Sequence, residues 1–389
     1  MDVSMNIKGV VLKVASRCNL NCEYCYMYNR GDSTYKLQPK FMSDEVVNNL
    51  FLRIQNYISK NNIADFLFIF HGGEPLLIKP LFYEEFIEKA NQRFLNQISL
   101  HYIIQTNGVL LSPEWCKVLG KLDVKIGISI DGMTQQANRL RVNHQGESSL
   151  EETLIGIKNA QESTYLRYLP SVLTVINLEV KPKDMYQQYR DKGIRNINVL
   201  LPDGTYDNLP FGHNFEATQY GDWLIELFES WFYDKDKNKP QIGIFNQLIN
   251  LILGGGGVFD SWGGGNNVHL IIETNGDIEP QDSLKSCGEG FTKTHLNVRH
   301  HEFEEIFEHK LFKMCLNGQQ KLGKKCQSCE VVDVCNGGFI THRFNRISGF
   351  DNPSIYCKDL EKLIRHISKS IELELPNNEI QKNLFTLNS

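Results

Sequence analysis

Three cysteines near the amino terminus carry the clearest chemical signal in this sequence. Cys18, Cys22 and Cys25 follow the apolar run Gly9–Ala15 with the spacing C-x-x-x-C-x-x-C. Cysteine thiolates are the usual protein ligands of iron–sulfur clusters, and a cubane has four irons to ligate. Three thiolates from one loop therefore leave one iron open. An open iron can do chemistry on a small molecule.

Zinc and buried free thiols are the alternatives for this loop. Structural zinc sites usually separate their cysteine pairs by a longer stretch and often add histidine. Here the first histidine after the loop is His71. Asn19, Asn21 and Glu23 make the loop too polar for a core segment. The spacing and the strand-to-loop context both favour a cluster.

Four cysteines near the carboxyl end form a second candidate metal site: Cys326, Cys329, Cys335 and Cys357. Four thiolates can close a 4Fe–4S cluster completely. Zinc stays an alternative, because an all-cysteine zinc site also contains a C-x-x-C pair. The first cysteine loop favours iron–sulfur here, and we expect one complete auxiliary cluster. The other cysteines are expected to be structural or partial ligands (Cys287, Cys315) or core (Cys116).

Strand and helix patterns alternate through the first half of the chain, which predicts a parallel sheet with right-handed crossovers. The fold class is therefore α/β, here a partial (β/α)6 barrel. In such barrels the chemistry lies at the carboxyl ends of the strands. The expected strands are Gly9–Ala15, Asp65–His71, Leu100–Thr106, Val124–Ile130, Tyr168–Val175 and Arg195–Leu200. The expected helices between them are Ser43–Lys60, Lys79–Leu95, Pro113–Lys121, Ser149–Glu162 and Pro182–Asp191.

Composition limits the classes of partner. A net charge of −5 gives no general attraction for nucleic acid or an anionic membrane. The sequence has no apolar run of spanning length and no signal peptide. Ten cysteines without a secretory signal indicate metal ligation in a reducing cytoplasm.

The three-cysteine loop resembles that of the radical S-adenosylmethionine (radical SAM) superfamily. The resemblance implies that the open iron binds SAM and that reductive cleavage yields a 5′-deoxyadenosyl radical, which abstracts hydrogen from a substrate. It also implies that Tyr24 lies against the adenine. The motif His71-Gly-Gly-Glu-Pro75 is similar to the segment that holds the SAM amino group, which assigns Gly72, Gly73 and Glu74 to SAM.

Further strand ends match the same superfamily. Gln105-Thr-Asn-Gly108 ends the third expected strand, and its Asn107 is a cofactor-binding candidate. Ser129 is expected near the ribose, with Asp131 as its neighbour. Arg141 matches the residue that holds the SAM carboxylate, a task suited to a guanidinium fork. Asn138 stands where the family has an acidic residue, and Arg139 competes with Arg141.

The carboxyl-terminal part resembles the SPASM extension of peptide-modifying radical SAM enzymes. It departs from that pattern at Phe339, where a further cysteine is usual, and in the hairpin at Asp282. The expected domains are the radical SAM barrel (1–235), a helix with a Gly-rich connection (236–267), the SPASM-like domain (268–375) and a tail (376–389). The run Gly254–Gly265 is either a linker or a lid.

A narrower resemblance is to peptide maturases of the Fxs and Xye type. It rests on segments such as Val14–Cys18, Asp282–Lys285, Gly337–Phe344 and Asn352–Cys357. That branch forms cyclophanes, which join an aryl carbon to the β-carbon of a neighbouring residue. The alternatives are an anaerobic sulfatase-maturing type oxidase, a thioether-forming maturase, or a non-catalytic Fe–S electron carrier.

Crosslinking needs a base, because the ring carbon must lose a proton. Asp282 is the candidate, followed by Glu279, which is expected on a solvated hairpin face, and His342. The implied partners are a precursor peptide and a flavodoxin- or ferredoxin-like reductant. Because the chain starts at the first expected strand, the peptide is expected to dock on the barrel or through a separate leader-binding protein.

Overall fold

The computed structural model describes residues 6–257, 267–317 and 322–374. They form two compact units, each described here by itself. The first comprises the described residues within Met5–Leu173 and Val268–Leu316, and the second those within Thr174–Asn267 and Asn317–Ser389. This division does not follow the expected boundaries at 235, 267 and 375, which stay predictions. Residues 258–266 of the Gly-rich run and the tail from 375 lie outside the described residues.

A parallel sheet forms the centre of the first unit. Its strands are β1 (Asn6–Ala15), β2 (Asp65–Gly72), β3 (Ser99–Thr106), β4 (Lys125–Ser129) and the start of β5 (Ser171–Val175). Each pairs in parallel with the next along the chain. The hairpin strands β8 (Asn267–Ile272) and β9 (Ile278–Glu279) are antiparallel, and β8 lies beside β1. The predicted α/β class with a parallel sheet is confirmed.

Alternating aromatic residues hold this sheet to its helices. Phe66, Phe68 and Phe70 of β2 are fully buried. Phe68 stacks on Tyr102 of β3 with 5.7 Å between ring centroids, and Phe70 meets Phe86 edge-on at 5.1 Å. Burying one such ring stabilises the fold by roughly 1.5–3 kcal/mol. The layer packs β2 against β3 and α2, and the parallel pairing of β1–β3 places their carboxyl ends at one edge.

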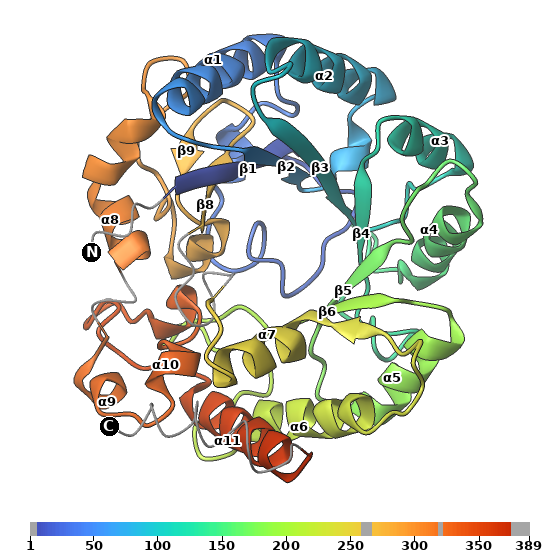
Figure 1. Cartoon of the computed structure of the whole chain (residues 1–389), viewed down its shortest axis with the longest axis vertical. Helices are drawn as coiled ribbons and strands as arrows, with labels where there is room; N and C mark the ends of the chain where they lie inside the picture. The colour runs from blue at the N-terminus through green and yellow to red at the C-terminus, as the bar shows by residue number, and fades with distance from the viewer. Residues whose placement is uncertain (1–5, 258–266, 318–321, 375–389) are drawn as a thin grey trace. The chain divides into compact units, whose positions relative to one another are not determined.

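Helices follow the strands as the sequence predicts: α1 (Asp44–Lys60), α2 (Pro80–Arg93), α3 (Pro113–Lys121) and α4 (Leu150–Glu162). The Ser43 hydroxyl accepts a hydrogen bond from the Val46 N–H at 3.3 Å and so caps α1. Ser112 caps α3 in the same way. α1 and α2 lie along the outer side of β1–β3 (Figure 1).

The second unit contains β6 (Asn196–Leu200) and β7 (Gln241–Ile242), which pair in parallel, and six α-helices among the described residues. Gly221 lets α6 approach α11, because a β-carbon there would lie 2.8 Å from the Asp359 carbonyl oxygen. The Asp359 carboxylate accepts a hydrogen bond from the Gly221 N–H at 2.8 Å. The helices are α5 (Pro182–Asp191), α6 (Gln219–Phe232), α7 (Gly243–Ile252), α9 (Lys324–Gln327), α10 (Val332–Cys335) and α11 (Cys357–Glu374).

The part of the first unit after the hairpin is built from short helices: η3 (Asp282–Cys287), η4 (Phe303–Glu308) and α8 (Lys310–Asn317). Arg53 of α1 ties η4 to the barrel by pairing with Glu302 and donating to the Val298 carbonyl. Among the described residues, no helix is both long and apolar enough to cross a membrane.

Candidate active site

The three predicted cluster ligands lie in the loop that follows β1. The Cys25 N–H donates to the Cys22 carbonyl at 3.1 Å, which folds the loop back on itself. Backbone bonds from Asn21 to Val142 and from Glu23 to Leu140 tie the loop to the segment after β4. The three thiols are therefore presented by a loop that is anchored on both sides.

The thiols fit the role of cluster ligands. Burial raises the pKa of Cys25 to about 12, and the nearby Cys22 thiol adds to the shift. Burial likewise raises the pKa of Cys18, whose sulfur accepts from the Leu20 N–H at 3.3 Å. A metal centre offsets this cost, since coordination deprotonates a thiol outright. Among the described residues no three His, Cys, Asp or Glu side chains converge on a single metal ion. The thiolates of a cubane each bind a different iron.

Two glycines allow the end of β2 to lie directly against the start of the cysteine loop. Gly72 has φ +137°, and a β-carbon there would lie 2.1 Å from the Ala15 carbonyl oxygen. A β-carbon on Gly73 would lie 2.3 Å from the Arg17 carbonyl oxygen. The Gly73 N–H donates to Ala15 at 2.8 Å, so any side chain here would separate the two segments. Their contact with SAM stays a prediction.

Glu74 joins the ends of β2 and β3. Its fully buried carboxylate accepts from the Leu76 N–H at 2.9 Å, the Thr106 hydroxyl at 2.6 Å and the Asn107 N–H at 2.8 Å. Burial raises the pKa of Glu74, and these hydrogen bonds work against that shift. A carboxylate has about four acceptor sites, so one is left for a further donor such as the predicted SAM ammonium.

Asn107 and Ser129 also lie at strand ends. The Asn107 side-chain amide donates to Asn19 at 2.8 Å and lies 3.7 Å from the Cys18 sulfur, which links β3 to the cysteine loop. The Ser129 hydroxyl accepts from the Gln105 amide at 2.8 Å. The positions agree with the expected strand ends, and the cofactor contacts stay predictions.

Tyr24, Asp131 and Arg141 form one hydrogen-bonded group. The Tyr24 hydroxyl donates to the Asp131 carboxylate at 2.6 Å and accepts from the Arg141 guanidinium at 2.7 Å. Arg141 is buried, whereas Arg139 is half-buried, and burial favours Arg141 as the SAM ligand. Sequence reasoning assigned the three residues separately and did not foresee that the Tyr24 hydroxyl joins them.

Asn138 supports this group indirectly. Its side-chain oxygen accepts from the Asp131 N–H at 3.0 Å, and its amide donates to the Gly132 carbonyl at 2.7 Å. The Arg141 N–H donates to the Asn138 carbonyl at 2.8 Å. The asparagine therefore holds the loop after β4, which carries Asp131.

Tyr24→Phe is expected to weaken SAM binding by about tenfold, because a hydrogen bond to a charged group contributes about 1.5–3 kcal/mol. Without the hydroxyl, Asp131 and Arg141 lose their common partner. Equilibrium binding of SAM to the reconstituted enzyme measures the effect. Tyr102→Phe is the control, because it removes a hydroxyl of β3 that donates to Asn91 of α2. An unchanged Kd for Tyr24→Phe would contradict this role.

The four carboxyl-terminal cysteines line one cavity of the second unit, together with Lys325 and Val332. Burial raises the pKa of Cys335 to about 12, and the neighbouring thiols, Cys357 first, add to the shift. Asn336, Gly337 and Gly338 all have positive φ, which turns the chain sharply after α10. This convergence fits one auxiliary cluster. Cys287 and Cys315 lie in the first unit, and Cys116 is buried in α3.

The three base candidates have different surroundings. Asp282 at the start of η3 pairs with Lys13 and accepts from the Tyr26 hydroxyl at 2.6 Å. The expectation that Glu279 is solvated is wrong, because it is fully buried and lies 2.8 Å from the Lys285 ammonium. His342, in the second unit, is buried, and burial lowers its pKa to about 3.

Sequence reasoning missed Lys13, Tyr26 and the part that His71 plays beside Asp282. The sequence did contain a signal for this group, because Lys13 is the one charged residue in the apolar run Gly9–Ala15. A lysine at an inward position of a buried strand needs a partner of opposite charge. The partner is 269 residues away in the chain, so spacing could not reveal it.

Comparison with known proteins gives a family match over the first part of the chain. Residues 12–181 match the model of the Radical SAM superfamily, so this part of the chain is similar to a radical SAM domain. SAM and 4Fe–4S clusters are the cofactors of that family, and the thiols described above fit them.

Relatives extend the similarity to nearly the whole chain. A serine-type anaerobic sulfatase-maturating enzyme of Bacteroides thetaiotaomicron is 25% identical over 97% of this chain and 94% of its own. A cysteine-type enzyme of Clostridium novyi is 23% identical over 94% and 96%. The fold is similar to that of native anSMEcpe with bound AdoMet and Kp18Cys peptide, with a TM-score of 0.79 and 20% identity over 95% of this chain and 100% of that one. Streptococcus suis SuiB has a TM-score of 0.59 and 14% identity, over 90% and 76%.

Proposed function

We propose that this chain is a radical SAM maturase that modifies a side chain of a ribosomally made peptide, forming an aryl-to-β-carbon (cyclophane) crosslink. The observation that carries the proposal is the hydrogen bond from Tyr26 to Asp282. Tyr26 directly follows the ligand Cys25, so this bond brings a carboxylate next to the cluster loop. Hydrogen abstraction and proton removal can then take place in one site.

The overall reaction removes two hydrogens from the peptide. SAM bound at the cluster loop would supply a 5′-deoxyadenosyl radical able to take one hydrogen atom from a β-carbon. The β-carbon then bonds to the aryl carbon, and that carbon loses its hydrogen as a proton and an electron. Asp282 accepts the proton, and an auxiliary cluster held by Cys326, Cys329, Cys335 and Cys357 would supply the electron acceptor. A flavodoxin- or ferredoxin-like protein supplies the electron for SAM cleavage.

Oxidation of a serine or cysteine side chain to an aldehyde is the second candidate. It is favoured by the 25% identity to a sulfatase-maturating enzyme over 97% of the chain. Both reactions begin with removal of a β-hydrogen and differ in the fate of the carbon radical. Phe339, where the SPASM pattern has a cysteine, and the segment Asp282–Lys285 support crosslinking.

The test is anaerobic incubation of the reconstituted enzyme with SAM, dithionite and peptides encoded beside its gene, followed by mass spectrometry. A cyclophane loses two hydrogens, does not react with hydroxylamine and gives no fragments between the joined residues. An aldehyde reacts with hydroxylamine and fragments normally. 5′-Deoxyadenosine without any peptide change would reject both candidates, and its absence would favour the electron carrier. A cytoplasmic location and a separate leader-binding protein also stay predictions.

Asp282→Asn is expected to lower the rate of peptide modification by about 10²–10⁴-fold, the usual contribution of a positioned base. SAM cleavage should stay within about twofold, since it needs no base. Asp277→Asn, on the same hairpin and partly exposed, is the matched control. Modification at the wild-type rate by Asp282→Asn would eliminate Asp282 as the base.

A further inference from the structure

Lys13 is a buried ammonium group at the point where three segments of the first unit meet. Its side chain is fully buried in β1, although lysine is rarely buried without a partner. It pairs with Asp282 of η3, and its Nζ lies 3.2 Å from Nδ1 of His71 at the end of β2. The Tyr26 hydroxyl is 3.5 Å away. The Lys13 ammonium thus contacts both Asp282 and His71.

The contacts of His71 determine its tautomer. Nδ1 receives the Gly72 N–H at 2.8 Å and faces the Lys13 ammonium. A backbone N–H and an ammonium group can only donate, so Nδ1 must carry a lone pair. The imidazole is therefore neutral, with its hydrogen on Nε2. Burial and Lys13 lower the pKa of His71 to about 3, and Asp282 opposes that shift.

Asp282 is the anionic member of the group. Its Oδ2 accepts from both Lys13 and Tyr26. Burial works against its ionisation, but Lys13 holds the pKa of Asp282 well below its usual range. The contacts described for this carboxylate use Oδ2, so Oδ1 can accept a hydrogen bond from a ligand.

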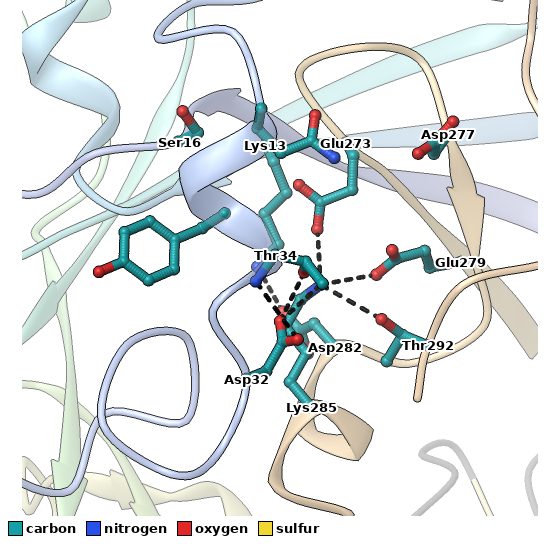
Figure 2. Close-up of polar contacts among 12 residues, drawn as sticks. Lys13, Ser16, Asp32, Thr34, Glu273, Asp277, Glu279, Asp282, Lys285 and Thr292 are labelled. Atoms are coloured by element: carbon teal, nitrogen blue, oxygen red, sulfur yellow. Dashed lines mark hydrogen bonds and ion pairs between the residues drawn. The ribbon is translucent and has the colours of Figure 1, made fainter. Parts of the chain in front are cut away.

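Lys285 and Lys293 form a second group of ion pairs with the carboxylates of the hairpin next to Lys13. Lys285 of η3 lies 3.1 Å from Glu273, 2.8 Å from Glu279 and 3.3 Å from the Thr292 hydroxyl (Figure 2). Asp32 is 4.0 Å away. Lys293 pairs with Glu279 and Asp277. Burial and Glu279 raise the pKa of Glu273, and Lys285 and Lys13 oppose that shift. Lys285 is therefore the cation that acts most strongly on Glu273, and Lys13 acts on it more weakly.

We propose that Lys13 is a positioning residue that keeps Asp282 as the anionic proton acceptor and His71 as a neutral hydrogen-bond donor whose Nε2–H binds a peptide carbonyl. The assignment of the acceptor rests on the proposed function. The assignment of the two protonation states rests on the contacts alone. On this view His71 is no base, although histidine is the residue most often assigned that role.

The first test measures protonation and needs no substrate. The oxidised holoenzyme is labelled with ¹⁵N-histidine, and His71→Gln identifies the signals of His71 in long-range ¹H–¹⁵N spectra. Wild-type His71 should stay the neutral Nε2–H tautomer from about pH 6 to pH 8, on either side of the ordinary histidine pKa. A hydrogen on Nδ1, or titration in this range, would overturn the proposal.

Lys13→Met removes the charge but keeps much of the chain length. Asp282 then lies beside His71 without its cation, so His71 should take up a proton with a pKa above the ordinary value of about 6.5. Unchanged His71 signals in a folded Lys13→Met protein would overturn the proposal. If that variant does not fold, the wild-type spectrum still decides the tautomer.

The second test distinguishes hydrogen-bond donation by His71 from base catalysis by His71. His71→Gln keeps an N–H donor that cannot titrate, and peptide modification should stay within about tenfold of wild type. His71→Leu and Lys13→Met should each lower modification about 10²-fold with SAM cleavage preserved. Equal losses for His71→Gln and His71→Leu would reject the donor role. If wild type modifies no peptide, the proposed function fails, while the spectra still decide the role of Lys13.

Discussion

Cys22→Ala combined with Cys25→Ala is expected to remove one cluster and abolish SAM cleavage. Both thiols belong to the loop after β1, and one remaining ligand, Cys18, cannot hold a cubane. Iron content should fall by about four atoms per chain. The rate of 5′-deoxyadenosine release should fall by more than about 10³-fold, because no open iron is left to bind SAM.

Iron analysis, Mössbauer spectra and chromatography of the nucleoside measure this result. Cys116→Ala is the matched control, since that thiol is fully buried in α3 and belongs to neither cysteine group. Its iron content and cleavage rate should equal those of wild type. Full iron content in the double variant would show that the loop ligates no cluster, and the proposed function would then fail.

Cys335→Ala combined with Cys357→Ala is expected to separate SAM cleavage from peptide modification. The two thiols line the cavity of the second unit, and Cys357 raises the pKa of both Cys335 and Cys326 there. Iron content should again fall by about four atoms per chain. Cleavage of SAM should persist, whereas modified peptide should fall by more than about 10²-fold, because the electron acceptor is lost.

The same iron analysis applies, with zinc measured in parallel. Zinc in place of the expected iron in the wild-type protein would favour the alternative of a structural zinc site. Peptide modification at the wild-type rate in the double variant would exclude any redox role for this cysteine group. Cys116→Ala again controls for the loss of a buried thiol.

Local patterns predicted the secondary structure closely because the determinants are local. Pro113–Lys121 and Pro182–Asp191 match the observed helices at both ends, and each begins with a proline, which suits the first turn. Strand ends differ by one to three residues, as in β1, which begins at Asn6 rather than Gly9. Pairing with β2 extends the ordered strand beyond its apolar run.

Contacts between residues of different segments could not be predicted from local sequence patterns. Glu279 carries a charge in a hairpin, which predicts exposure, but Lys285 and Lys293 make its burial possible. Glu74 was assigned to SAM alone, yet two of its acceptor sites hold the end of β2 to the end of β3. In both residues the partners come from other segments that only the folded chain brings close.

The sequence by itself predicted the two cysteine ligand sets, and it determined the α/β class and the strand ends where the candidate residues lie. These follow from residue type, spacing and periodicity, which need no knowledge of distant partners. Only the tertiary structure decided how the charges are shared, with Lys13 assigned to Asp282 and His71, and Lys285 to Glu273 and Glu279. The physical reason is that the protonation state of a buried group depends on its neighbours in space, and those neighbours are separated in the sequence by as many as 269 residues.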